Sequence, residues 1–443
     1  MRGSPWPVRV FATDDTSAQL TWRGSPAEGL RLEIGGSVLV PAPTPKAELL
    51  LSLTARRGLH RMASGAGGGS DSSSGARWAR ALSFAAGTRT LDPAWPGGPG
   101  SAVADGLAPG TAYDVVASAE GVPRFLAARL RTLVPPEGRL VYRFATVSDV
   151  HIGEKQFGVM GRIHDPLGCY GPGACGGDGC LTFPERALRA AIDEAVSWGA
   201  QLLVVKGDLT RNTAPAEVRD VGALLGSCPV PVEVILGNHD NQRGVDVRGV
   251  LESEGISVPW HPKPIDLPGV RLVMVNTPHS DPRRHAGEIP ADLSRRIVEL
   301  VGETAGSGRG AWVGLHHPPE MRPYRTVYPP GVPYGESRLL LSSLAAVQPA
   351  TMVSAGHRHR NRRYDYGPVV ISEVGSTKDY PGCWAGYRVF EGGLVQVVRR
   401  TARPDVMSWT EATRRAVNGQ WSRWSPGRLE DRCFAVDWRE RSR

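Results

Sequence analysis

Five short polar blocks contain the side chains whose types and spacing could do chemistry. They read Ser-Asp-Val-His at 148–151, Lys-Gly-Asp at 206–208, Gly-Asn-His-Asp at 237–240, His-His-Pro-Pro at 316–319 and Gly-His-Arg-His at 356–359. Together they offer carboxylate, amide oxygen and imidazole donors, and no thiolate. These donors suit borderline divalent metals such as Mn, Fe, Zn or Ni. The blocks therefore indicate a metal site, provided that the fold brings them together.

Each block directly follows an apolar run that is typical of a buried strand. The runs include AQLLVVK at 200–206, VPVEVIL at 230–236 and ATMVSA at 350–355. The segment 182–200 has apolar residues at helical spacing and a glycine near its end. Alternating strands and helices predict a layered α/β fold from residue 140 onward. In such sheets the ligand crevice lies at the carboxyl ends of the strands, so blocks far apart in sequence can converge.

The last block differs from the others because arginines surround its histidines. On an extended segment, side chains at positions i and i+2 share a face. His357 and His359 could therefore reach two metal ions while Arg358 points away. The arginines that follow are expected to form a solvated loop, the alternative being that one of them faces a phosphate group; they are Arg360, Arg362 and Arg363.

In this order, the five blocks resemble those of the calcineurin-like metallophosphoesterase family, and the resemblance covers residues 140–400. It implies a four-layer α-β-β-α sandwich and a dinuclear centre of two divalent metal ions. Asp208 is expected to bridge both ions, and His239 is expected to stand beside the leaving group as a catalytic residue that binds no metal. The family pattern implies that one ion is held by Asp149, His151 and His359, and the other by Asn238, His316 and His357.

Each of these residues also has an interpretation that involves no metal. Asp149 could cap a turn, Asn238 could occupy a left-handed position after a glycine, and His316 could be a satisfied core histidine. The occurrence of all five blocks in family order argues against these separate interpretations. Two neighbouring residues are not assigned to the metals. His317 is expected to be structural, because the family's ligand begins the His-x-Pro segment, and Asp240 is expected to form local hydrogen bonds.

The first part of the chain has a different pattern, which predicts an all-β sandwich domain before the catalytic one. Residues 1–134 contain short β-rich runs bounded by Gly, Pro and Asp, with almost no helical periodicity. Trp22 and Tyr113 resemble the core tryptophan and the corner tyrosine of a fibronectin type III sandwich. The Gly/Ser tract at 64–75 is predicted to be a disordered loop. Residues 401–443 form a Trp-rich basic tail that is expected to pack on the catalytic domain at 140–400.

Composition limits the remaining classes of function. The net charge is +8, and no apolar stretch approaches the length of a membrane helix. No N-terminal segment resembles a signal peptide, so a cytoplasmic location without a membrane partner is expected. The basic residues form no continuous stripe, which disfavours a nucleic-acid partner and leaves protein partners open.

Three cysteines lie close together in the sequence and could bind a structural zinc, but they lack a clear fourth ligand; they are Cys169, Cys175 and Cys180.

These observations predict an enzyme that hydrolyses phosphoester bonds with two divalent metal ions. The blocks look most like those of bacterial cyclic-nucleotide and glycerophosphodiester phosphodiesterases, which implies a phosphodiesterase acting on a small substrate. Purple acid phosphatases also have a fibronectin-like domain, but they carry a tyrosine where this chain has Arg211 and a glycine where it has His151. Two alternatives stay open: a phosphomonoesterase, and a non-catalytic binding or scaffold protein with a vestigial metal site.

Overall fold

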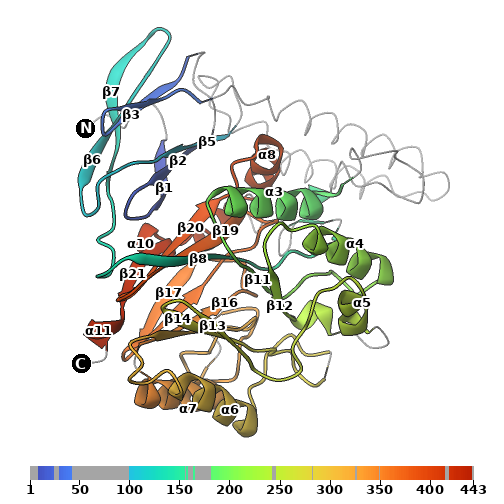
Figure 1. Ribbon diagram of the computed structural model, residues 1–443. Helices are drawn as coiled ribbons and strands as arrows, with labels where there is room; N and C mark the ends of the chain where they lie inside the picture. The colour runs from blue at the N-terminus through green and yellow to red at the C-terminus, as the bar shows by residue number, and fades with distance from the viewer. Residues whose placement is uncertain are drawn as a thin grey trace, which may run out of the picture.

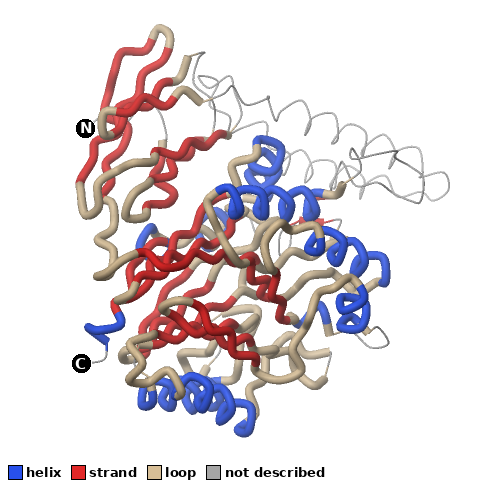
Figure 2. Tube along the Cα trace, in the orientation of Figure 1, coloured by secondary structure: helices blue, strands red, loops and turns tan. Residues whose placement is uncertain are grey.

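The structure, a computed structural model, describes residues 8–23, 29–41, 99–154, 156–157, 163–164, 181–241, 246–281, 283–324, 327–348, 350–414 and 419–441. The Gly/Ser tract at 64–75 lies outside these residues, as do the three cysteines at 169–180, so the predictions made for both stay predictions. Figure 1 and Figure 2 show two large β-sheets between two groups of helices, with a smaller β-rich region attached.

The first large sheet has the strand order β12-β11-β8-β19-β20-β21. Strands β8, β11 and β12 are parallel to one another, and β19, β20 and β21 continue the sheet in antiparallel fashion. Three of the polar blocks follow β8, β11 and β12, so they emerge at the same end of the sheet. The strands are β8 (Leu140–Val147), β11 (Leu203–Lys206), β12 (Val232–Ile235), β19 (Cys383–Phe390), β20 (Gly393–Arg400) and β21 (Cys433–Asp437).

The second large sheet has the strand order β13-β14-β15-β16-β18-β17. Its four central strands are parallel, and β13 and β17 pair antiparallel at the edges. The remaining two blocks follow β15 and β16. The strands are β13 (Lys263–Leu267), β14 (Val270–Met274), β15 (Gly310–Gly314), β16 (Thr351–Ala355), β17 (Arg362–Tyr366) and β18 (Val369–Glu373). A separate two-stranded sheet consists of β9 (Gln156–Phe157) and β10 (Ile163–His164).

Helices cover the outer face of each large sheet (Figure 1). The first sheet carries α3 (Phe183–Ser197), α4 (Pro215–Gly226) and α5 (Val247–Ser253), and the second carries α6 (Ala291–Gly302) and α7 (Tyr334–Val347). Between the sheets, the Phe144 ring stacks on Tyr387 with 4.5 Å between centroids and meets Trp312 edge-on. The four layers that the sequence predicts, α-β-β-α, are therefore confirmed.

Local sequence explains why these elements form. Helix α3 begins with a capping box, in which the side chain of Glu185 accepts from the backbone amide of Thr182, and it has Pro184 in its first turn. In contrast, every residue of β14, β15 and β16 is buried. Continuous burial is typical of parallel strands that are covered on both faces.

The N-terminal residues form two small antiparallel sheets. One contains β1 (Arg9–Thr13), β2 (Ala18–Trp22) and β5 (Gly100–Ala104), and the other contains β3 (Arg31–Ile34), β4 (Ser37–Leu39), β6 (Ala112–Ala119) and β7 (Val122–Arg131). Trp22 is buried in the apolar cluster of this region, and the Tyr113 hydroxyl accepts a hydrogen bond from the Ala108 amide at 2.7 Å. A β-rich N-terminal region is thus confirmed, and its assignment to the fibronectin type III class stays a prediction.

Buried ion pairs join this region to the first large sheet. Arg388 of β19 donates to Asp15 at 2.6 Å, and Arg399 of β20 donates to Asp14 at 3.2 Å. Phe11 of β1 packs in one apolar cluster with residues of β20 and β21. Because separating these partners would leave charges buried and unpaired, the contact fixes the small sheets on the large one.

The C-terminal residues also pack on the large sheets. They form α8 (Pro404–Thr413), α9 (Trp421–Trp424), α10 (Leu429–Arg432) and α11 (Trp438–Arg441), besides β21. Trp409 stacks on Phe183 of α3 with 4.1 Å between centroids, and Trp438 belongs to the apolar core between the sheets. The exact domain limits stay predictions. In the described part of the chain, no helix has the length and apolar character that crossing a membrane requires.

Candidate metal centre

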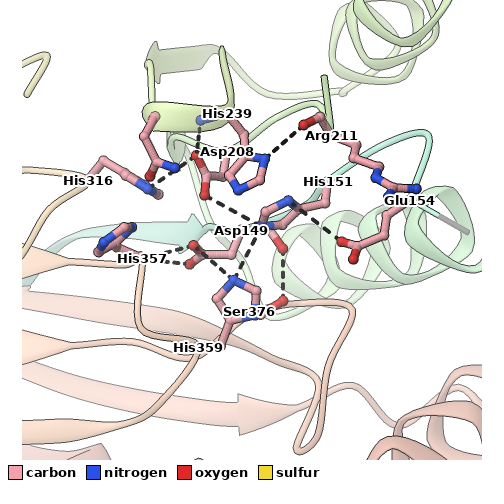
Figure 3. Close-up of polar contacts among 12 residues, drawn as sticks. Asp149, His151, Glu154, Asp208, Arg211, His239, His316, His357, His359 and Ser376 are labelled. Carbon is pink, nitrogen blue, oxygen red and sulfur yellow. Dashed lines mark hydrogen bonds and ion pairs between the residues drawn. The ribbon is translucent and has the colours of Figure 1, made fainter. Parts of the chain in front are cut away.

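The predicted site residues lie close together at the carboxyl ends of strands from both large sheets (Figure 3). Their side chains form overlapping groups in which the possible ligand atoms lie within 4.8 Å of one another. The groups are Asp149, His151 and His359; His151, Asp208 and His239; Asp149, Asp208 and His316; and His316, His317 and His357. Five strands, β8, β11, β12, β15 and β16, position these residues and Asn238, because each strand ends just before one of the blocks.

The first part of the site is built by the segment after β8 and the second histidine of the last block. The Nε2 atoms of His151 and His359 lie 3.2 Å apart. His359 Nε2 is 3.4 Å from Asp149 Oδ1, and His151 Nε2 is 3.5 Å from Asp208 Oδ2. Two imidazole nitrogens and two carboxylate oxygens therefore face one point, an arrangement that could hold one divalent ion.

The second part of the site lies on the other side of the Asp208 carboxylate. His316 Nε2 is 3.3 Å from Asp208 Oδ1, and the ring centroids of His316 and His357 are 5.1 Å apart. Asn238 begins the short 3-10 helix η2 (Asn238–Asp240), and its buried Oδ1 has no hydrogen-bond partner among the described residues. Asp208 thus presents one oxygen to each part of the site, which is the geometry that a bridging ligand needs.

Hydrogen bonds at the outer nitrogen fix the orientation of three imidazoles. His316 Nδ1 donates to the carbonyl of Lys206 at 2.8 Å, and His357 Nε2 donates to that of Pro330 at 3.0 Å. His359 Nδ1 contacts the carboxylate of Asp379 at 2.5 Å. In each case the other ring nitrogen is left as the donor atom for a metal. Because His316 Nε2 is also buried without a hydrogen-bond partner among the residues that the structure describes, this donor set fits a cation.

The backbone of the site adopts conformations that residues other than glycine rarely take. Six described non-glycine residues have a positive φ, and five of them are predicted ligands: Asp149 (54°), His151 (52°), Asp208 (51°), His357 (69°) and His359 (48°). Such residues cost on the order of 1–3 kcal/mol each and cluster at functional sites. The expectation that His357 and His359 lie on an extended segment is therefore wrong. Both residues have left-handed φ values instead.

The glycines inside the blocks allow this close packing. A Cβ atom on Gly237 would lie 2.2 Å from Asp208 Oδ1 and 2.8 Å from His316 Nε2. A Cβ atom on Gly356 would lie 2.7 Å from Asp149 Oδ2. Any other residue at these two positions would displace a predicted ligand, which explains why a glycine precedes the polar residues of both blocks.

The charges of the site shift the pKa values of its side chains in two directions. Burial lowers the pKa of His151 and His357 well below the ordinary value, and neighbouring cationic groups lower it further. Burial acts in the same direction on His316 and His359, but the adjacent carboxylates outweigh it and raise their pKa to about 9 and about 10. Although burial opposes its ionisation, nearby histidines hold the pKa of Asp208 well below its ordinary value. The adjacent carboxylates thus favour the protonated form of His316 and His359 in the metal-free site.

The structure places the residues that were not assigned to a metal as follows. The carboxylate of Asp240 accepts from the amides of Leu209, Thr210 and Gly237, so its role is to hold the loops. Burial, together with the charge of Asp208, raises the pKa of Asp240 to about 6. The Nδ1 of His317 contacts the Thr277 hydroxyl at 2.9 Å.

His239 lies at the mouth of the site, half-buried. Its amide donates to Asp208 Oδ1 at 2.9 Å and its Nδ1 donates to the carbonyl of Arg211 at 2.8 Å, which leaves Nε2 free to face a substrate. Sequence reasoning missed His285, an exposed residue whose Nδ1 is 3.2 Å from Asn238 Nδ2. It belongs to the connection between β14 and α6 and follows no strand, so the rule that located the other residues gives no signal for it.

The arginines after the last block do not form the expected solvated loop. Arg360 is buried and pairs with the buried carboxylate of Glu373, and residues 362–366 form the edge strand β17. Arg358 points away from the two histidines, as expected, and pairs with Glu320 and Glu373. The prediction was wrong for Arg360 because its partner lies on the neighbouring strand β18, a pairing that no local pattern reveals.

Several known proteins are similar to this chain. Residues 142–361 match the family model described as calcineurin-like phosphoesterase. A protein of Synechococcus sp. named probable cyclic nucleotide phosphodiesterase is 24% identical over 218 residues, or 48% of this chain and 79% of that protein. A purple acid phosphatase from yellow lupin (Lupinus luteus) seeds has a TM-score of 0.39 and 11% identity, with 91% of this chain and 73% of that one covered. For a phosphopantetheinyl hydrolase from Mycobacterium tuberculosis the TM-score is 0.31 and the identity 14%, with 54% and 90% covered.

The chain therefore contains a calcineurin-like phosphoesterase domain, and it is a hydrolase of the metallophosphoesterase class. Enzymes of this class use a dinuclear metal centre. The His and Asp groups that could hold such a centre all lie within residues 142–361.

Proposed function

We propose that the protein is a phosphodiesterase that acts on a small substrate of the cyclic-nucleotide or glycerophosphodiester type. The observation that carries the proposal is the position of the buried Asp208 carboxylate, whose oxygens lie 3.5 Å from His151 Nε2 and 3.3 Å from His316 Nε2 within two groups of possible metal donors. The preference for a diester is supported by the resemblance of the blocks and by the name of the Synechococcus relative. The metals proposed for this donor set are Mn, Fe, Zn or Ni.

We assign the ligands from the family pattern, and the distances among the side chains of Asp149, His151, Asp208, His316 and His359 support this assignment. One ion is held by Asp149, His151 and His359, the second by Asn238, His316 and His357, and Asp208 bridges both. His316 is preferred over His317 because its Nε2 lies 3.3 Å from Asp208 Oδ1.

Two bound divalent ions would supply positive charge to the phosphoryl oxygens and a more acidic water. The residues of the chain orient the substrate and manage its protons. His239 presents a free Nε2 beside the site and can give a proton to the departing oxygen. The burial of the site lowers the local dielectric and strengthens each charge interaction made there.

A panel of three substrates tests the proposed function. The full-length chain, supplied with Mn²⁺, should hydrolyse bis-p-nitrophenyl phosphate and cyclic AMP faster than p-nitrophenyl phosphate, measured as kcat/KM. A preference for the monoester would favour the phosphomonoesterase alternative. Tightly bound metal without hydrolysis of any of the three would favour the binding or scaffold alternative.

Metal affinity should rise with pH. His316 and His359 have a raised pKa and carry protons in the metal-free site, and a metal ion must displace these protons. Below about pH 9 the apparent affinity should therefore fall as the pH falls. Calorimetric titration of Mn²⁺ in buffers of different ionisation enthalpy, from pH 6 to pH 9, should show proton release on binding. A pH-independent affinity without proton release would contradict the assignment of these two histidines.

A second set of charged residues contacts the Nδ1 atoms of two proposed ligands, His359 and His151. Asp379 contacts His359 Nδ1 and receives a hydrogen bond from the buried Lys378 at 3.2 Å. Lys378 also pairs with Glu154 at 2.7 Å, and Glu154 lies 3.7 Å from His151 Nδ1. Although burial opposes its ionisation, Lys378 and His359 hold the pKa of Asp379 well below its ordinary value. Both histidines of the first metal site are thus attached to one network of buried charges.

Substitution of Asp379 should weaken the first metal site without removing a ligand. Partners of this kind orient the imidazole and raise its basicity, and losing one typically costs 10–100-fold in metal affinity. We expect Asp379→Ala to lose about that much affinity and Asp379→Asn, whose amide oxygen can still accept from His359, to lose less. Metal titration followed by competition with a chelator measures both. Equal losses in the two variants, or none, would show that Asp379 does not position His359.

A further inference from the structure

A second cavity adjoins the metal centre but contains none of the proposed metal ligands. Its volume is about 480 Å³, within the range of small-molecule sites. Its walls come from the segment after β15, from the segment between β16 and β17, from β17 itself, and from the C-terminal residues around α9. His359 alternates in sequence with Arg358 and Arg360, so the histidine faces the metal centre while the two arginines face this cavity.

The lining of the cavity is strongly cationic. Six arginines and one carboxylate, that of Glu320, are among its fourteen lining residues. The arginines are Arg322, Arg358, Arg360, Arg362, Arg423 and Arg428. Two of them are buried and neutralised by two acids: Arg358 pairs with Glu320 and Glu373, and Arg360 pairs with Glu373. The charges of these two buried arginines are therefore neutralised by the two carboxylates.

The other four arginines at the rim have almost no compensation. Arg362 has its nearest carboxylate partner, Asp431, at 3.8 Å. The oxygens of Asp431 already accept from the backbone amides of Arg363 at 3.1 Å and Arg428 at 2.8 Å. In the part of the chain that the structure describes, the guanidinium groups of the remaining three form no ion pair; they are Arg322, Arg423 and Arg428.

We propose that this cavity is a second site, separate from the metal centre, that binds a small anion carrying more than one phosphate group. Like charges converging on a cavity repel one another unless an anion joins them, and a cavity lined by one sign of charge concentrates counter-ions. A planar guanidinium group can donate two parallel hydrogen bonds to two oxygens of one phosphate. The Trp424 ring, against which the Arg360 guanidinium lies at 4.2 Å, adds an aromatic wall. The proposal does not depend on which phosphoester the metal centre hydrolyses.

The test uses the full-length chain loaded with Mn²⁺ and a matched pair of double variants. Arg423→Gln/Arg428→Gln removes two rim charges from the cavity. Arg295→Gln/Arg338→Gln removes two exposed charges from α6 and α7, away from the cavity, and serves as the control. Because all four residues are exposed, both variants should fold. Isothermal titration at about 0.15 M salt, where screening limits unspecific attraction, measures binding of inorganic triphosphate and of ATP.

At the cavity, we expect wild type and control to bind one equivalent that the cavity variant binds on the order of 10²-fold more weakly, since two charge-assisted contacts are lost. Any equivalent that binds at the metal centre should be unchanged in all three proteins. Hydrolysis of bis-p-nitrophenyl phosphate should stay within about twofold in all three proteins, because the metal centre is intact. Loss for both probes supports a site for the phosphate chain. Loss for ATP alone would contradict it, because triphosphate carries the same phosphate groups that the removed arginines are proposed to bind. Equal binding by wild type and cavity variant would overturn the proposal, as would an equal loss in the control.

Discussion

Asp208→Ala should lose both metal ions and lower turnover by at least about 10³-fold. The two oxygens of this carboxylate face the two halves of the site, at 3.5 Å from His151 and 3.3 Å from His316. Alanine removes a ligand from each proposed ion at once, and the charge stabilisation that these ions give to the phosphoryl group is lost with them. Elemental analysis of the purified protein, together with kcat on bis-p-nitrophenyl phosphate, measures both effects.

Asn238→Ala is the matched comparison, because Asn238 belongs to one half of the site only. It should retain the metal held by Asp149, His151 and His359 and lose chiefly the other. The circular dichroism spectra of both variants should match that of the wild type. If the Asp208 variant kept two full equivalents of metal, the bridging assignment would be wrong. If the two variants lost the same amount, the division of the site into two halves would be wrong.

The fold and the location of the site follow from rules that act locally along the chain. Continuous apolar runs predict strands that are covered on both faces, and the parallel strands β14, β15 and β16 are buried throughout. Once these strands are recognised, the carboxyl-end rule brings the five blocks together without any knowledge of the three-dimensional contacts. This is why residues as distant in sequence as Asp149 and His357 can be grouped correctly: in the structure the His357 amide donates to Asp149 Oδ1 at 2.9 Å.

The supporting charges could have been found by the same rule. Ser376 and Asp379 follow the apolar strand β18 just as the five blocks follow theirs. The Ser376 hydroxyl donates to the carbonyl of Asp149 at 2.8 Å, and Asp379 contacts His359. They carry no recognisable spacing of metal donors, so an analysis that starts from donor types passes over them. Lys378 is harder to predict, since a buried lysine is expected only where its acidic partners are known.

Other features depend on contacts that no local pattern contains. Arg360 is buried because Glu373, on the neighbouring strand, neutralises it. The left-handed φ of His357 and His359 is one such feature, because histidine adopts this conformation more often than most residues but the sequence does not show which histidines do so. The cationic cavity also could not be predicted from a local pattern. Its arginines come from separate segments that meet only after the C-terminal residues have packed on the catalytic region.

His239→Ala should leave both metals in place and slow the hydrolysis of an alkyl diester by about 10²–10⁴-fold, the usual contribution of a general acid. The variant keeps the backbone amide that donates to Asp208 Oδ1 at 2.9 Å, so the bridging carboxylate stays in position. What it loses is the imidazole, whose Nδ1 donates to the Arg211 carbonyl and whose Nε2 is free. The loss should depend on the leaving group. A sugar alkoxide needs a proton to depart, whereas a nitrophenolate departs readily without one.

The decisive measurement compares kcat/KM of variant and wild type on cyclic AMP and on bis-p-nitrophenyl phosphate, at matched metal occupancy. A large loss on cyclic AMP with a much smaller loss on the aryl diester identifies His239 as the proton donor. An equal loss on both substrates would mean that His239 positions the phosphate instead. Because His239 also falls in one group of possible metal ligands with His151 and Asp208, metal content must be measured in the same samples. A variant that lost one equivalent of metal would show that His239 is a ligand. The general acid would then have to be another residue at the mouth of the site. The exposed His285, whose Nδ1 lies beside Asn238, is the candidate.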